Sequence, residues 1–182
     1  MKVFLAVFLV HWFYGTTESI EDYYWRDFKG LVPSDAIPCV LDSDETSYIG
    51  QFSVVAEYNK DVADIHTLVA TLYTGNRRAV AAYNGRTVYS SDHSNLKILC
   101  SSNARYRYSW KSIKSVFSPN CRFVIAGYED NVPMYVGRAV RGKDKVLGKV
   151  YSDTSFHDAK LSVPHQGGEE KYDAYELLTY CY

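Results

Sequence analysis

The sequence carries almost no net charge and has few long apolar segments. Its 20 Lys and Arg side chains nearly balance 21 Asp and Glu, which gives a net charge of -1. A strong positive excess is what draws proteins to nucleic acid and to anionic membranes, so we expect neither partner. The main apolar run, Val3–Tyr14, has 12 residues, well short of the roughly 20 that span a bilayer. We therefore expect no insertion into a membrane.

The motifs of common enzyme and metal sites are missing as well. The chain contains no G-x-S-x-G elbow, no H-E-x-x-H pair and no P-loop. It also lacks the C-x-x-C pair that usually marks a structural zinc site. His157, Asp158 and His165 lie on loop-rich sequence at a spacing that favours no ligand set. We expect no enzymatic activity, no cofactor and no metal.

The N-terminus has the features of a secretory signal peptide. Lys2 precedes the apolar run, and small or polar residues follow at 15–19. Cleavage after Thr17 or Ser19 would leave small residues at the positions that the peptidase reads. We expect residues 1–19 to be removed and the remaining chain to be secreted into the extracellular space.

The cysteines fit that compartment. All four, Cys39, Cys100, Cys121 and Cys181, lie beyond residue 19. An even number in a secreted chain indicates two disulfides, with three possible connectivities. No N-x-[ST] acceptor occurs, so N-glycosylation is not expected.

The rest of the chain has the pattern of an all-β protein. Tyr is abundant, with 17 copies beside 8 Phe and 3 Trp, and aromatic residues favour strands. Asn84-Gly85 and Gln166-Gly167-Gly168 are hairpin-turn signals. Within an apparent insertion at Ser53–Thr67, we expect a helical turn at Lys60–Leu68. Strands are expected at Thr46–Val54, Thr67–Tyr73, Ala79–Tyr83, Asn95–Cys100, Arg105–Trp110, Arg122–Ala126, Lys160–Pro164 and Ala174–Tyr180.

The segment Ile125–Val150 holds the candidate binding chemistry. It is predicted to be a hairpin whose first turn gathers Glu129, Asp130 and Asn131, while Lys149 on the returning strand faces them. A carboxylate accepts paired hydrogen bonds and an ammonium donates up to three, which suits a hydroxyl-rich ligand such as a sugar. The plain alternative is an ordinary hairpin with a surface ion pair, worth roughly 0–1 kcal/mol.

The chain also shows internal self-similarity. Tyr24-Trp25 and Ser109-Trp110 open two similar series of motifs, and matched positions are offset by 82 to 87 residues. Matched tryptophans indicate a shared packing role. We therefore divide the chain into a first copy at 20–100 and a second copy at 101–182, which form one all-β unit with a common core.

The second copy resembles the DM-nine repeat, a tandem module of secreted and cytosolic invertebrate proteins that also occurs in natterin-like proteins. The resemblance rests on A-G-Y-E-D-N (126–131), M-Y-V-G-R-A (134–139), L-G-K-V (147–150), Gly167-Gly168-Glu169 and Y-E-L-L (175–178). It implies two pseudo-symmetric antiparallel repeats that exchange strands. It also implies a lectin, typically for mannose, in innate immune recognition, and such two-repeat lectins commonly form homodimers.

The resemblance also suggests site residues and a disulfide scheme. In the second copy Glu129, with Asp130 beside it, and Lys149 would bind the sugar, and Tyr128 or Tyr135 would form a stacking wall. In the first copy Asp42 is the matching acid. A pseudo-twofold arrangement allows Cys39–Cys100 with Cys121–Cys181, or Cys39–Cys181 with Cys100–Cys121, and exchange of strands favours the second scheme.

An alternative function stays open beside the lectin. The first copy has Ala70-Thr71 where the second has the Gly-Lys pair, so it lacks the sugar-binding lysine. A secreted, non-catalytic structural or interaction module with a decayed sugar site accounts for that loss.

Overall fold

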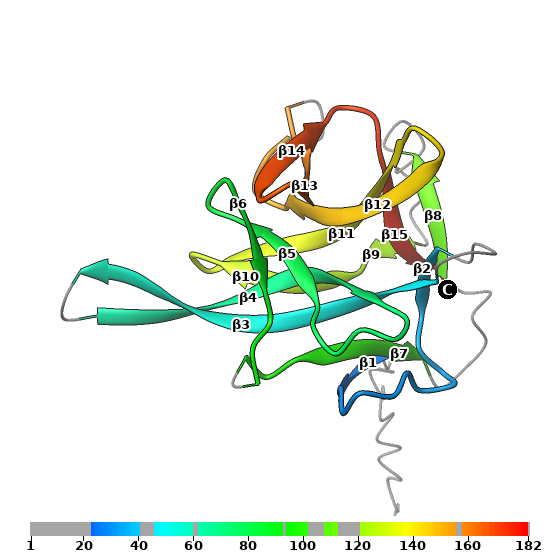
Figure 1. Cartoon of the computed structure of the whole chain (residues 1–182). Coiled ribbons are helices and arrows are strands. Elements are labelled where there is room, and N and C mark those ends of the chain that lie inside the picture. Colours follow the sequence, from blue (N-terminus) through cyan, green and yellow to red (C-terminus); the bar gives the residue numbers. More distant parts are fainter. Residues whose placement is uncertain are drawn as a thin grey trace, which may run out of the picture.

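The computed structural model describes residues 23–40, 46–59, 62–92, 94–101, 108–112, 121–155 and 158–181. Every regular element in these ranges is a β-strand (Figure 1), as the sequence predicts. No helix among the described residues is long and apolar enough to cross a membrane. The predicted signal peptide, residues 1–19, lies outside the described ranges.

Fifteen strands make up the described chain. Their bounds are β1 Tyr23–Asp27, β2 Pro38–Val40, β3 Ser47–Asn59, β4 Val62–Tyr73, β5 Val80–Tyr83, β6 Arg86–Tyr89, β7 Lys97–Ser101, β8 Tyr108–Ser112, β9 Cys121–Phe123, β10 Ile125–Glu129, β11 Val132–Arg141, β12 Asp144–Tyr151, β13 Leu161–His165, β14 Gly168–Tyr172 and β15 Glu176–Cys181.

Eight of these strands close into an antiparallel barrel (Figure 1). The order around the ring is β4, β5, β6, β14, β13, β12, β11 and β10, and β10 pairs again with β4. Two seams join the halves of the chain. At one seam Tyr128 pairs with Thr67, and at the other Gly168 pairs with Arg86. The first half supplies three strands of the ring and the second half supplies five.

The strands outside the ring extend it at two places, and the order of strand pairing is similar in the two halves of the chain. In the first half the pairing runs β1–β7–β3–β4–β5–β6, and in the second half it runs β8–β15–β11–β12–β13–β14. The short strands β2 and β9 pair with β3 and β15. The two halves therefore use their strands in the same order.

Two glycines are required by close backbone approach. A Cβ on Gly148 would lie 2.0 Å from the carbonyl oxygen of Ser162, and one on Gly127 would lie 2.3 Å from the carbonyl oxygen of Thr67. These distances are far below van der Waals contact, so only glycine lets β12 lie against β13 and β10 against β4. The motifs A-G-Y and L-G-K thus contain residues that close the barrel.

The core is built by both halves together. One buried cluster combines Ile49, Val69 and Leu99 from the first half with Met134 and Val136 from the second. Trp25 and Trp110 are partly buried against this same cluster. Their predicted role as packing residues is confirmed.

The predicted helical turn at Lys60–Leu68 is wrong. Residues 62–68 belong to β4, whose pairing with β3 continues without a helix from Ser47↔Tyr73 to Asn59↔Val62. The apparent insertion therefore lengthens a hairpin, which projects from the body of the molecule (Figure 1). Continuous backbone pairing satisfies the donors and acceptors of the ladder, which an isolated helical turn does not.

The predicted hairpin turns are confirmed by their backbone geometry. Asn84 and Gly85 have φ values of 48° and 72°, and Gln166 and Gly167 have values of 47° and 82°. Positive φ at both central positions is the requirement of a tight two-residue hairpin.

The favoured disulfide scheme is wrong. Cys121 is bonded to Cys181, its register partner on the neighbouring strand, while Cys39 and Cys100 are free and buried. The other scheme is right for one bridge only. Cys39 and Cys100 do not form the second bridge, because their side chains belong to separate core clusters.

Candidate functional site

Lys149 reaches across the inside of the barrel. Its strand, β12, pairs with β11 and β13, yet its ammonium nitrogen lies 2.5 Å from Oε1 of Glu129 on β10. The two side chains are only 2% and 4% exposed. The predicted pairing of carboxylate and lysine is therefore present, but as a buried ion pair rather than a surface pair.

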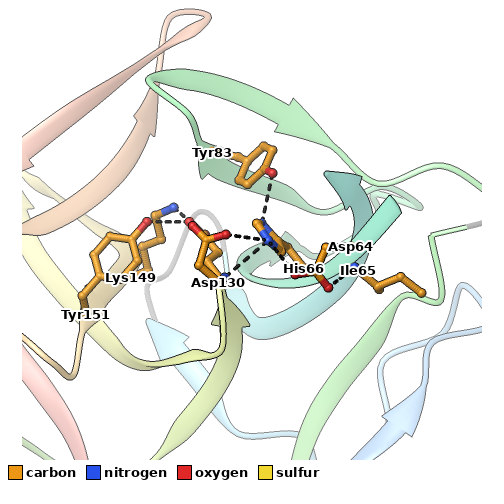
Figure 2. Close-up of polar contacts among 8 residues, drawn as sticks. Asp64, Ile65, His66, Tyr83, Asp130, Lys149 and Tyr151 are labelled. Carbon is orange, nitrogen blue, oxygen red and sulfur yellow. Dashed lines mark hydrogen bonds and ion pairs between the residues drawn. The ribbon is translucent and has the colours of Figure 1, made fainter. Parts of the chain in front are cut away.

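Aromatic side chains enclose this ion pair. The hydroxyl of Tyr151 donates to Oε2 of Glu129 at 2.5 Å, and the rings of Tyr151 and Tyr83 lie 5.2 and 5.8 Å from the Lys149 ammonium (Figure 2). Burial and the hydrogen bond to the Glu129 carboxylate both raise the pKa of Tyr151. The phenol therefore keeps its proton and donates at neutral pH. We call Glu129, Lys149 and Tyr151 the Glu129 cluster.

Glu129 is the last residue of β10, and Asp130 is the first residue of the tight turn that follows it. Asp130 and Asn131 both have positive φ, at 50° and 63°, as in the two-residue turn that joins β10 to β11. The turn directs Glu129 into the barrel, whereas the side chain of Asp130 remains 56% exposed. Two carboxylates that are adjacent in the sequence thus lie in different environments, one in the barrel interior and one at the surface.

A second polar group lies on the other side of the same turn. His66, which is 3% exposed on β4, has Nε2 3.2 Å from Oδ1 of Asp130 and 3.8 Å from Oδ2 of Asp64. Its Nδ1 is 3.0 Å from the hydroxyl of Tyr83 (Figure 2). We call Asp64, His66 and Asp130 the His66 cluster.

Sequence reasoning missed the His66 cluster. His66 and Asp130 are 64 positions apart in the chain, and only the seam between β4 and β10 brings them together. The one local signal is the spacing of Asp64 and His66, which places both side chains on the same face of a strand.

A polar pocket opens beside Tyr151. It has a volume of about 300 Å³ and is lined by Tyr151, Thr154, Asp158, Ala159, Lys160, Ser162 and Lys171. Ser162 lies opposite Lys149 in the register, and Lys171 lies opposite Ser162. Register partners project from the same face of a sheet, so this pocket faces the side from which Lys149 extends.

Family comparison matches residues 42–172 to the DM9 repeat, which is more than half of the chain. This protein belongs to the DM9 repeat family. The predicted resemblance is confirmed, and no curated protein matches the chain. The DM9 family is linked to carbohydrate-binding proteins and is generally non-catalytic.

The other predicted site residues of this DM9 protein are Tyr135, Asp42 and Tyr128. Tyr135 packs on Phe123 with ring centroids 4.8 Å apart, and burial raises its pKa, so it is not part of the Glu129 cluster. Asp42 lies outside the described residues. Tyr128, the other predicted stacking residue, is 48% exposed and directly precedes Glu129.

Proposed function

We propose that this DM9 protein is a secreted carbohydrate-binding protein of lectin type, which takes neutral, mannose-like glycans in innate immune recognition. The observation that carries the proposal is the Glu129 cluster, in which a carboxylate, an ammonium and a phenol meet within the part of the chain that matches the DM9 repeat. These groups accept from and donate to sugar hydroxyls. The defence role rests on the family resemblance.

In this proposal a sugar hydroxyl takes the position of the Tyr151 hydroxyl. The Tyr151 hydroxyl donates to one oxygen of Glu129, and Lys149 makes one hydrogen bond among the described residues, to the other oxygen. Two of the three lysine donors thus remain for a ligand. In the proposed complex the sugar fills the pocket beside Tyr151, the phenol turns aside, and ligand hydroxyls replace it at Glu129 and Lys149. A pocket of about 300 Å³ is at the small end of ligand sites.

The proposal includes two repeats with one complete site. Residues 20–100 and 101–182 form the copies, supported by the matching order of strand pairing. Register also supports this alignment, because Gly50 pairs with Ala70 on β4 as Gly137 pairs with Gly148 on β12. The residue at the position of Lys149 is then Thr71, a buried hydroxyl that carries no charge. The functional site is therefore assigned to the second copy.

One observation favours the alternative, an extracellular interaction module. The Glu129 and Lys149 side chains are almost fully buried, so the pair can serve the barrel alone. In that case the DM9 motif would be retained for packing and the sugar site would have decayed.

A glycan-array screen of the oxidised protein separates the two functions. Lys149→Ala is unsuitable as the diagnostic variant, because it leaves a buried carboxylate without its cation and so destabilises the fold. The double variant Glu129→Gln/Lys149→Met removes both charges and keeps the side-chain volumes. Asp144→Asn/Lys143→Met removes one charge of each sign from two exposed residues, at the start of β12 and in the turn before it, and is the matched control.

A lectin requires saturable binding of a defined neutral glycan by the wild type and the control, with loss of binding in the Glu129→Gln/Lys149→Met variant. Thermal unfolding of each variant confirms that its fold is intact. Equal binding by all three proteins would mean that the glycan binds at a place other than the Glu129 cluster. No binding at high glycan density would favour the interaction module.

A further inference from the structure

The His66 cluster has a donor set that the proposed sugar site does not use. One imidazole nitrogen and two carboxylate oxygens, from His66, Asp64 and Asp130, all lie within 4.8 Å of one another. Two ligands come from β4 and the third from the turn after β10 (Figure 2). The long hairpin and the closing seam of the barrel together create this arrangement.

The imidazole is held in a fixed orientation. Its Nδ1 is hydrogen-bonded to the Tyr83 hydroxyl at 3.0 Å, and the two rings meet edge to face with centroids 5.7 Å apart. A hydrogen bond at one ring nitrogen is the usual support for a histidine that binds metal through the other. Here the other nitrogen, Nε2, faces the two carboxylates.

The space in front of Nε2 favours a positive charge. The backbone N–H of Asp130 donates to Nε2 at 3.3 Å, so in a neutral ring this nitrogen presents its lone pair. Oxygens of Asp130 and Asp64 lie 3.2 and 3.8 Å from this same nitrogen, so three electron-rich atoms face one another. A cation among the three groups offsets the repulsion between them.

We propose that Asp64, His66 and Asp130 bind a divalent transition-metal ion of the Zn²⁺ type. Zinc takes imidazole nitrogen and carboxylate oxygen at about 2.0–2.2 Å, which places tetrahedral ligands about 3.4 Å apart. The separations of 3.2 and 3.8 Å at Nε2 lie on either side of that value. Calcium, which takes six to eight oxygens, does not suit a set containing imidazole.

The site is accessible from solvent. The side chains of Asp64 and Asp130 are 46% and 56% exposed, while the His66 side chain is buried. The ion therefore enters past the carboxylates and binds the imidazole below them, with its remaining coordination position open to water. Binding takes up the lone pair of Nε2, and the long hydrogen bond from the Asp130 backbone is given up.

Calorimetric titration of the full chain with Zn²⁺ tests the site, with Asp64→Asn as the diagnostic variant. Asp64 is half-exposed, so the variant is expected to fold. Asp144→Asn, on the exposed start of β12, removes the same charge elsewhere. We expect one tight site in the wild type and the control, at least tenfold weaker in Asp64→Asn. Co²⁺ bound in its place should give the visible absorption of a four-coordinate ion.

Two results would overturn the metal site. One is the absence of saturable Zn²⁺ binding by the wild type. The other is equal Zn²⁺ affinity in the wild type and Asp64→Asn, which places the ion elsewhere. The titration contains no glycan, so the metal site and the proposed lectin function succeed or fail separately.

Discussion

Replacing Lys149 by Met should destabilise the protein strongly, although it puts an apolar side chain into a buried position. The change leaves the Glu129 carboxylate 4% exposed with the Tyr151 phenol as its remaining hydrogen-bond donor among the described contacts. Removing one partner of a buried ion pair costs about 3–5 kcal/mol, because the other charge stays desolvated. For a chain of this size that loss lowers the melting temperature by about 6 to 20 °C.

The second substitution should reverse most of this loss. In Glu129→Gln/Lys149→Met neither charge remains, and replacing both partners of a buried pair by neutral groups is often close to neutral. The amide oxygen introduced by Glu129→Gln can still accept a hydrogen bond from Tyr151. Equilibrium urea unfolding of the wild type, both single variants and the double variant measures the coupling energy. The disulfide must stay intact in all four proteins.

Two outcomes would contradict this reasoning. A loss below about 1 kcal/mol for Lys149→Met is the value of an exposed pair, and it would mean that water reaches the interior of the barrel. A double variant no more stable than Lys149→Met would mean that packing, rather than an unpaired charge, causes the loss.

Three further predictions follow from the close approaches and the cysteines. Gly148→Ala should cost about 3 kcal/mol or prevent folding, since its methyl group meets a backbone carbonyl at 2.0 Å; a near-native melting temperature would contradict that. Burial raises the pKa of the Cys39 thiol to about 12 and that of Cys100 to about 11, so neither should react with iodoacetamide in the native protein at neutral pH, whereas unreduced protein in urea should gain two labels by mass spectrometry. Rapid native labelling would show that these thiols are accessible. Replacing Cys121 and Cys181 by Ser opens a loop of 60 residues and should cost about 4 kcal/mol in urea unfolding; an unchanged midpoint would argue against the bridge.

Local sequence was sufficient for the second hairpin. The acceptors Glu129 and Asp130, the tight turn and the returning Lys149 all follow from short-range patterns, because register in a hairpin is fixed by its turn. What those patterns could not give is the burial of the pair. Burial depends on β4 and β5, which lie far away in the chain and supply the wall opposite β12.

The errors have the same origin. The segment 60–68 mixes apolar and polar residues in a way that suits a helical turn, but both faces of β4 are partly covered, so Leu68 and Val69 are buried side by side. The expected exchange of disulfide partners was also wrong, because Cys121 and Cys181 lie opposite each other on neighbouring strands. In both cases the pairing of strands decided the outcome.

The two seams of the barrel also determine when the protein can finish folding. Thr67 pairs with Tyr128 and Arg86 pairs with Gly168, so each seam closes a loop of roughly 60 to 80 residues and forms only after the second half is available. Contacts of such long range make folding slow. Until the second half is synthesised, β4 and β6 keep open edges, which are templates for pairing with other chains. During synthesis the nascent first half therefore exposes two strand edges that the finished barrel covers.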